Sequence, residues 1–311
     1  MVVSLFLIIN WIPSEAESIQ YYAKQCNKIA GISINDFSCE DGKEIPIETK
    51  KNKDNLSQPC NNPSLLGKGN PCMTGSKLGM LTFNDDAIVI FICRKFNDSR
   101  ATDGLYDEVA IIQHNKKSGA TCWYQSDLKP SAPIPPNIKS PKDSDFVDEK
   151  NQIKWELPSN LEKHAKCVNC HTNDPFVGTP YIKNILEDFL RKNKYTYEDR
   201  IQGAYWSPYL EWNNLKHVEF LKESSGKQCT SCHRIALNPA NENTCQRFLS
   251  ESLGLKDETH PNIPRINAFM PPHNRDNLTI EKAKKILADI KSCCQEPDGE
   301  RCKVSELNQK D

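Results

Sequence analysis

Residues 87–92 read Ala-Ile-Val-Ile-Phe-Ile, an uninterrupted apolar run. A short run of this kind, rich in β-branched residues and flanked by polar residues, predicts a buried β-strand. Val109–Ile112 and Thr121–Tyr124 are two further β-type runs, and the Lys-Ser-Gly turn at 117–119 separates them. We therefore predict a small antiparallel β domain over residues 17–125.

Cysteine usage indicates an oxidising compartment. The chain has 14 cysteines in 311 residues, and four of them belong to two Cys-x-x-Cys-His motifs. The remaining ten form an even set, which suggests up to five disulfides. Their positions suggest that six pair within the N-terminal half and four within the C-terminal tail. The ten are Cys26, Cys39, Cys60, Cys72, Cys93, Cys122, Cys245, Cys293, Cys294 and Cys302.

The start of the chain resembles an export signal. Val2–Ile12 is largely apolar and uncharged, and Ser-Glu-Ala at 14–16 is a small-x-small pattern. We predict a signal peptide over residues 1–16, although no basic residue precedes the apolar run. A buried N-terminal strand is the alternative. No other stretch has transmembrane length, so we expect a periplasmic or secreted protein without an integral membrane segment after signal cleavage.

The second half of the chain has a different pattern. Residues 126–154 contain several closely spaced prolines, which predicts an extended linker. Beyond it, Ser159 and Glu162 have the spacing of a capping box, and Thr179-Pro180 can begin another helix. We predict a mainly helical region, with helices over 161–170, from Thr179, over 209–223, over 244–253 and from Thr279.

Two short motifs carry the chemistry. Residues 167–171 read Cys-Val-Asn-Cys-His, and residues 229–233 read Cys-Thr-Ser-Cys-His. In such a motif the two thiols add to the vinyl groups of haem, and the adjacent histidine binds the iron. We predict covalent haem at Cys167, Cys170 and His171, and again at Cys229, Cys232 and His233. A four-cysteine zinc site and a redox-active dithiol are the alternatives, but a zinc site does not need a histidine after each pair.

Residues 226–302 resemble the c-type cytochromes. The second motif is followed by Met270-Pro271-Pro272 and then by the helix predicted from Thr279. In small c-type cytochromes a methionine in this context is the sixth ligand, so the resemblance implies that Met270 binds the second iron. Simple packing of Met270 is the alternative, and His273 could replace it as the ligand.

The sixth ligand of the first haem is less evident. Residues 160–228 contain no methionine. On a helix, His217 would share one stripe with Leu210, Val218 and Leu221, so it can face inward and bind the iron. A buried histidine bonded to protein is the equal alternative. His260, His114, Met73 and Met80 could also reach this haem, whereas we expect His164, three residues before Cys167, to face solvent or the neighbouring haem.

The ligands separate two kinds of function. Two histidine ligands would give the first haem a lower potential than a His/Met second haem, so electrons would pass from the first to the second. An open first iron could instead bind a small substrate such as peroxide, and the chain would be an enzyme. A subunit of a larger exported redox complex is a third possibility.

The sequence thus predicts an α+β protein, with a disulfide-stapled antiparallel β domain before a mainly α-helical dihaem cytochrome c region. That region would hold the first haem over about 155–225 and the second over about 226–302, within 155–311. We expect an electron carrier rather than an enzyme, with other redox proteins as partners. Lys plus Arg total 40 and Asp plus Glu total 41, so a nucleic-acid partner has no support.

Overall fold

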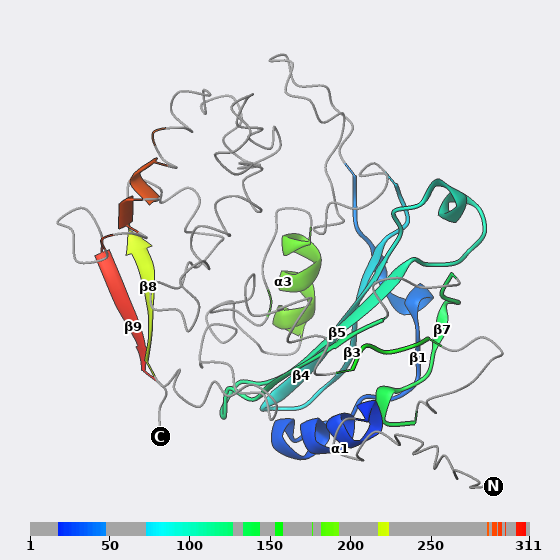
Figure 1. The fold of residues 1–311 in the computed structure, drawn as a ribbon, viewed down its shortest axis with the longest axis horizontal. Helices are drawn as coiled ribbons and strands as arrows, with labels where there is room; N and C mark the ends of the chain where they lie inside the picture. The colour runs from blue at the N-terminus through cyan, green and yellow to red at the C-terminus, as the bar shows by residue number, and fades with distance from the viewer. Residues whose placement is uncertain are drawn as a thin grey trace, which may run out of the picture.

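The computed structural model describes an antiparallel sheet and the elements packed on it (Figure 1). The sheet has the strand order β2-β3-β4-β5-β6. Its strands are β2 (Lys43–Glu44), β3 (Lys77–Phe83), β4 (Ala87–Arg94), β5 (Glu108–Asn115) and β6 (Thr121–Gln125). The residues described are 18–47, 73–126, 133–143, 153–157, 176, 182–192, 217–223, 285, 288–290, 292–293, 296 and 303–308.

The position of strand β4 between two cores explains why its sequence is apolar without interruption. Val89 and Phe91 point into a core on one face of the sheet. Ile88 and Ile90, which alternate with them, point into a second core on the other face. Successive side chains of a strand lie on opposite faces, so a strand covered on both sides needs apolar residues at every position. The predicted strands at 87–92, 109–112 and 121–124 are confirmed.

The first face of the sheet is covered by helix α1 (Ile19–Ala30), which the sequence analysis did not predict. Ser18 caps the helix, since its hydroxyl accepts a hydrogen bond from the Tyr21 amide at 3.1 Å. Gly31, in the left-handed conformation with φ 67°, ends it. The helix buries one stripe against the sheet, formed by Ile19, Tyr22, Ala23, Cys26 and Ala30.

The described parts of the proline-rich segment also pack on this domain. Strand β7 (Asn137–Ile138) pairs with β1 (Phe37–Ser38), and Ile134 bridges to Tyr106. Further along, Trp155 bridges to Ser126 and is buried in the same core. Extended backbone of the kind that proline favours can still pair with a neighbouring strand. The core therefore extends beyond residue 125, into the segment that composition suggested was a linker.

Two disulfides join elements of the first core. Cys26 of α1 is bonded to Cys122 of β6, with the Cα atoms 6.0 Å apart. Cys39 of the 3₁₀ turn η2 (Cys39–Asp41) is bonded to Cys93 of β4, at 5.9 Å. Both disulfides lie within the N-terminal half, as predicted. Cys293 is also disulfide-bonded.

The predicted fold class is wrong for the later part of the chain that the structure describes. The helix expected over 209–223 is replaced by strand β8 (His217–Glu223), which pairs with β9 (Lys303–Asn308) in an antiparallel ribbon. The described residues form a sheet-rich protein with a few helices, not a β domain followed by a mainly α-helical region. Helix α3 (Lys183–Lys192) does confirm the helix predicted from Thr179. None of the described helices is long and apolar enough to cross a membrane.

Gly79 allows the close approach of β3 to Phe91. The two residues are cross-strand partners, and a Cβ at position 79 would lie 2.2 Å from two atoms of the Phe91 ring. Phe91 is 1% exposed, so the ring has little room to move away. We expect Gly79→Ala to lower the free energy of unfolding by about 1–3 kcal/mol, as overpacked cores do. Urea unfolding followed by circular dichroism measures the change.

The control for Gly79→Ala is the double variant with Phe91→Leu, which removes the ring that the new methyl group meets. The two substitutions should be less harmful together than their separate effects predict, because they share one contact. An unchanged unfolding midpoint in Gly79→Ala alone would show that β3 and β4 can move apart to admit the methyl group without loss of stability.

Candidate functional site

The residues of both predicted haem motifs lie outside the described part of the chain. The same holds for the predicted sixth ligand of the second haem; the set is Cys167, Cys170, His171, Cys229, Cys232, His233 and Met270. His217 is described only as the first residue of β8. The helical stripe that grouped His217 with Val218 does not apply in a strand, where neighbouring residues point to opposite faces. The argument that His217 faces inward is therefore lost.

The second face of the sheet packs against helix α3 and Phe176, which come after the first motif in the sequence. Helix α3 lies on this face, opposite the face that α1 covers (Figure 1). We call this surface the α3 face. Its core is formed by Leu78, Ile88 and Ile90 of the sheet, by Ile45 just after β2, and by Phe176, Leu186 and Leu190.

Helix α3 is also tied to the sheet edge by charge. Asp188 forms ion pairs with Lys43 of β2 and with Lys192 of its own helix, the latter at 3.1 Å. The hydrogen bond from Lys43 is the main reason that the pKa of the Asp188 carboxyl lies well below its usual value. Apolar packing and this ion pair together hold α3 on the α3 face.

His114 is the titratable side chain buried at this face. It lies on β5 opposite Ile88, and it is 1% exposed. Its Nδ1 is 2.9 Å from the hydroxyl of Thr121, and that hydroxyl donates to the carbonyl oxygen of Gly119 at 3.0 Å. Both contacts are satisfied together only if Nδ1–H donates to Thr121. The Nε2 atom of His114 then carries a free lone pair.

That lone pair has no hydrogen-bond donor among the described residues. The Nε2 atom is fully buried and unpartnered, which is uncommon for a buried polar atom. Burial lowers the pKa of His114 to about 3, so the ring is neutral near neutral pH. The ring of Phe176 packs edge-on against the imidazole, with the centroids 5.9 Å apart and the planes at 89°. A neutral imidazole with a free Nε2 is the form in which histidine binds a metal.

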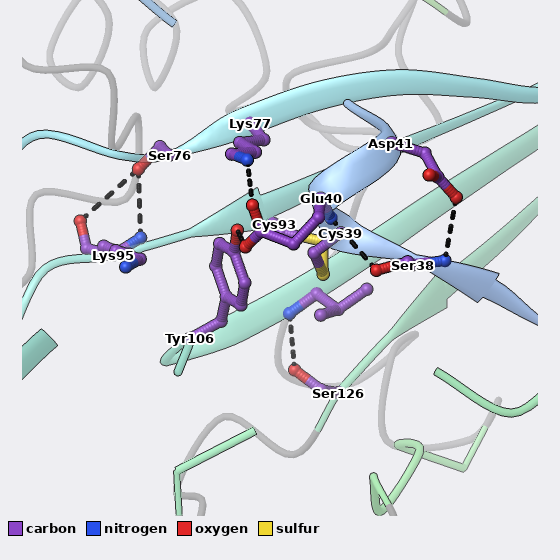
Figure 2. The surroundings of a disulfide bond; sticks show 11 residues. Ser38, Cys39, Glu40, Asp41, Ser76, Lys77, Cys93, Lys95, Tyr106 and Ser126 are labelled. Atoms are coloured by element: carbon purple, nitrogen blue, oxygen red, sulfur yellow. Dashed lines mark hydrogen bonds and ion pairs between the residues drawn. A yellow bond between two sulfur atoms is a disulfide. The ribbon is translucent and has the colours of Figure 1, made fainter. Parts of the chain in front are cut away.

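A cluster of polar side chains surrounds the Cys39–Cys93 disulfide (Figure 2). Glu40 accepts hydrogen bonds from Lys77 and, at 2.8 Å, from the Tyr106 hydroxyl. The bond from Lys77 is the main cause that lowers the pKa of Glu40, while burial above all raises the pKa of Tyr106. Lys95 lies 5.0 Å from the centre of the Tyr106 ring. These groups satisfy one another, which indicates that they hold η2 in place.

Comparisons with known proteins give no relative for this chain: no family model, curated protein or solved structure matches it. The described residues include no group of three or more His, Cys, Asp or Glu side chains placed to hold a metal ion. Functional inference therefore rests on the chain's own residues.

The sequence analysis named His114 as one of several residues that could reach the first haem, without a reason to prefer it. The alternation of side chains between the two faces of β5 could have indicated the surroundings of His114. Ile112 and His114 are two residues apart and share the α3 face, whereas Gln113 lies on the opposite face and donates to Asn27 at 3.0 Å. The alternation shows that His114 lies on an apolar face. It does not show which segment covers that face.

Proposed function

We propose that the chain is an exported dihaem c-type cytochrome that transfers single electrons between other redox proteins. One haem would be bound through Cys167 and Cys170 with His171 on the iron. The other would be bound through Cys229 and Cys232 with His233 and Met270 on the iron. The observation that carries the proposal is the complete Cys-x-x-Cys-His motif, present twice in a single chain.

The disulfides agree with this proposal. Cys26, Cys39, Cys93 and Cys122 are paired, as expected of a protein that matures in an oxidising compartment such as the periplasm or the cell exterior. Two zinc-binding Cys-x-x-Cys pairs would not need a histidine after each, so haem explains more of the sequence than zinc does.

The protein would control the haems through ligands and burial. Each haem supplies an iron that changes between the ferric and ferrous states. The imidazoles of His171 and His233 would each donate a lone pair to iron. The Met270 thioether is a poor donor to ferric iron and would raise the potential of the second haem.

Covalent attachment is tested by haem staining on a denaturing gel and by pyridine haemochrome quantification of the protein produced with a haem-attachment system. Two covalent haems per chain are expected. Cys167→Ala with Cys170→Ala, and separately Cys229→Ala with Cys232→Ala, should each remove one haem. Cys294→Ala with Cys302→Ala is the matched control, because those cysteines are outside the motifs. A chain that binds zinc and no haem would refute the proposal.

The sixth ligand of the second haem has its own expected result. Met270→Ala should abolish the red charge-transfer band of a methionine–ferric iron bond, because no other thioether is expected on that iron. Optical spectroscopy of the oxidised holoprotein measures the band. His273→Ala, three residues away, should leave the band intact. Survival of the band in Met270→Ala would exclude Met270 as the ligand.

A further inference from the structure

We infer that helix α3 and Phe176 form an acid-sensitive cover over the α3 face, which opens when His114 takes up a proton. Together they are called the α3 cover below. Its opening would expose the apolar side chains of the sheet that it buries, which include Leu78, Ile88 and Ile90. This inference goes beyond electron transfer, and it does not depend on haem attachment.

The first step is that the closed α3 face has no partner for a second proton on the His114 ring. The Nδ1–H group already donates to Thr121 at 2.9 Å, so a further proton can be added only at Nε2. The Nε2 atom is buried and has no hydrogen-bond partner among the residues that the structure describes. A buried charge without a partner is costly. Protonation of His114 therefore favours a state in which the ring reaches water.

The second step is to find which neighbour of His114 moves most easily. Strand β5, which carries His114, is paired with β4 on one side and with β6 on the other, and the Cys26–Cys122 disulfide bonds β6 to α1. The α3 cover lies on the opposite face from α1 (Figure 1). Its edge-on contact between Phe176 and the imidazole is the one that closes over the ring. The cover can therefore leave His114 without disturbing the sheet or α1.

The contacts that hold the α3 cover in place are of moderate strength. Leu186 and Leu190 pack with Phe176 in the second core. At the edge of the sheet, Lys43 pairs with Asp188 and lies 5.3 Å from the centre of the Phe189 ring. The Lys43–Asp188 pair is partly exposed, and ion pairs of that kind contribute little to stability. Release of this cover is therefore a local opening of the protein, which requires less free energy than unfolding of the whole domain.

The pH range of the response follows from the His114 ring. Burial lowers the pKa of His114 from 6.5 to about 3, and no charged side chain contributes to that change. The charged groups of the surrounding elements form ion pairs with one another: Arg94 with Glu108, Lys117 with Asp86, and Lys43 and Lys192 with Asp188. A histidine exposed by opening regains its ordinary pKa, so the closed state is fully favoured above about pH 6.5. Below that value the equilibrium constant for opening should rise about tenfold for each pH unit, down to about pH 3.

The Asp188 carboxyl does not produce this response. The hydrogen bond from Lys43 holds the pKa of Asp188 well below its usual value. A carboxyl with a lowered pKa stabilises the closed state above its ordinary pKa, near 4 for Asp, and loses that effect only as the pH falls below it. Between about pH 6.5 and about pH 4.5, a loss of the α3 cover therefore reports His114.

Hydrogen exchange of the purified full chain, followed by mass spectrometry, tests the inference. The readout is the protection factor of the α3 peptide, which is the intrinsic exchange rate at each pH divided by the measured rate. In the wild type this factor should fall about 50-fold from about pH 6.5 to about pH 4.5, because opening takes up one proton. The protection factor of α1 should fall far less. Constant protection of α3, or an equal fall in α1, would overturn the inference.

Variants of His114 and Asp188 identify the group that responds. His114→Leu places an apolar side chain that cannot be protonated under Phe176, so protection of α3 should be the same at both pH values. If lost protection of α1 shows that this variant misfolds, His114→Gln should give the same flat profile from a lower starting value. Asp188→Asn removes the ion pair and should lower protection of α3 by a similar factor at both pH values. A fall that persists without His114, or that disappears in Asp188→Asn, would overturn the inference.

Discussion

Replacing Cys26 and Cys122 together by Ala is expected to lower the free energy of unfolding by about 4 kcal/mol. The disulfide closes a loop with a sequence separation of 96, and in the chain-entropy account a loop of that size restricts the unfolded state strongly. Both sulfur atoms belong to residues that are 0% exposed, so Ala also leaves a small loss of packing. Urea unfolding followed by the fluorescence of the domain's tryptophans measures the change.

The second disulfide provides a matched comparison. Cys39–Cys93 has a sequence separation of 54, so loop entropy predicts that its removal costs about 0.5 kcal/mol less. Both double variants should fold at low temperature, because the two cores are built from apolar contacts. A larger loss at the shorter loop would show that the contacts near η2, rather than loop closure, dominate the effect.

Replacing Glu108 by Ala is expected to cost about 3–5 kcal/mol, because it leaves the Arg94 guanidinium almost buried without its counter-charge. The two residues are cross-strand partners on β4 and β5, and the Arg94 Nη1 donates to the Glu108 carboxylate. Their side chains are 11% and 3% exposed. Chemical denaturation of the single variants gives the free-energy differences.

Two further variants show whether the cost comes from an unpaired buried charge. Replacing Arg94 and Glu108 together by Leu should recover most of the stability, since no charge is then buried alone. Lys117→Ala breaks the 2.9 Å ion pair with Asp86, in which the Lys117 side chain is 73% exposed and the Asp86 side chain 36%. This substitution should change the free energy of unfolding by less than about 1 kcal/mol. If Glu108→Ala is as mild as Lys117→Ala, the Arg94 charge must reach water in the folded protein.

The fold was predictable where the sequence is apolar without interruption. The run at 87–92 can only be buried on both faces, and the structure has a core on each side of it. Helix α1 was not predicted, although it has a regular buried stripe of its own. The prediction of a helix at residues 217–223 was wrong because seven residues fit a period of 3.6 or of two almost equally. Pairing with the distant β9 makes this segment a strand.

The candidate site likewise has a part that the sequence predicts and a part that it does not. The haem-attachment motif can be recognised in a sequence because its two thiols and its histidine must keep one local spacing, and attachment itself stays a prediction for this chain. The state of His114 is not readable, because it depends on the pairing of β5 with β6, which brings Thr121 to the ring. Neither does the sequence show that Phe176 lies on this ring, since 62 residues separate Phe176 from His114 along the chain. Contacts of this range come from the packing of whole elements.

The complete burial of the four paired cysteines has a consequence for maturation. The proposed haem attachment would require the motif thiols in reduced form, while Cys26, Cys39, Cys93 and Cys122 are oxidised in the same chain. Thiolates attack only disulfides that they can reach, and all four of these cysteines are 0% exposed. A β domain that folds first would therefore withdraw its sulfurs from exchange. The motif cysteines could then be reduced and loaded without scrambling the domain that precedes them.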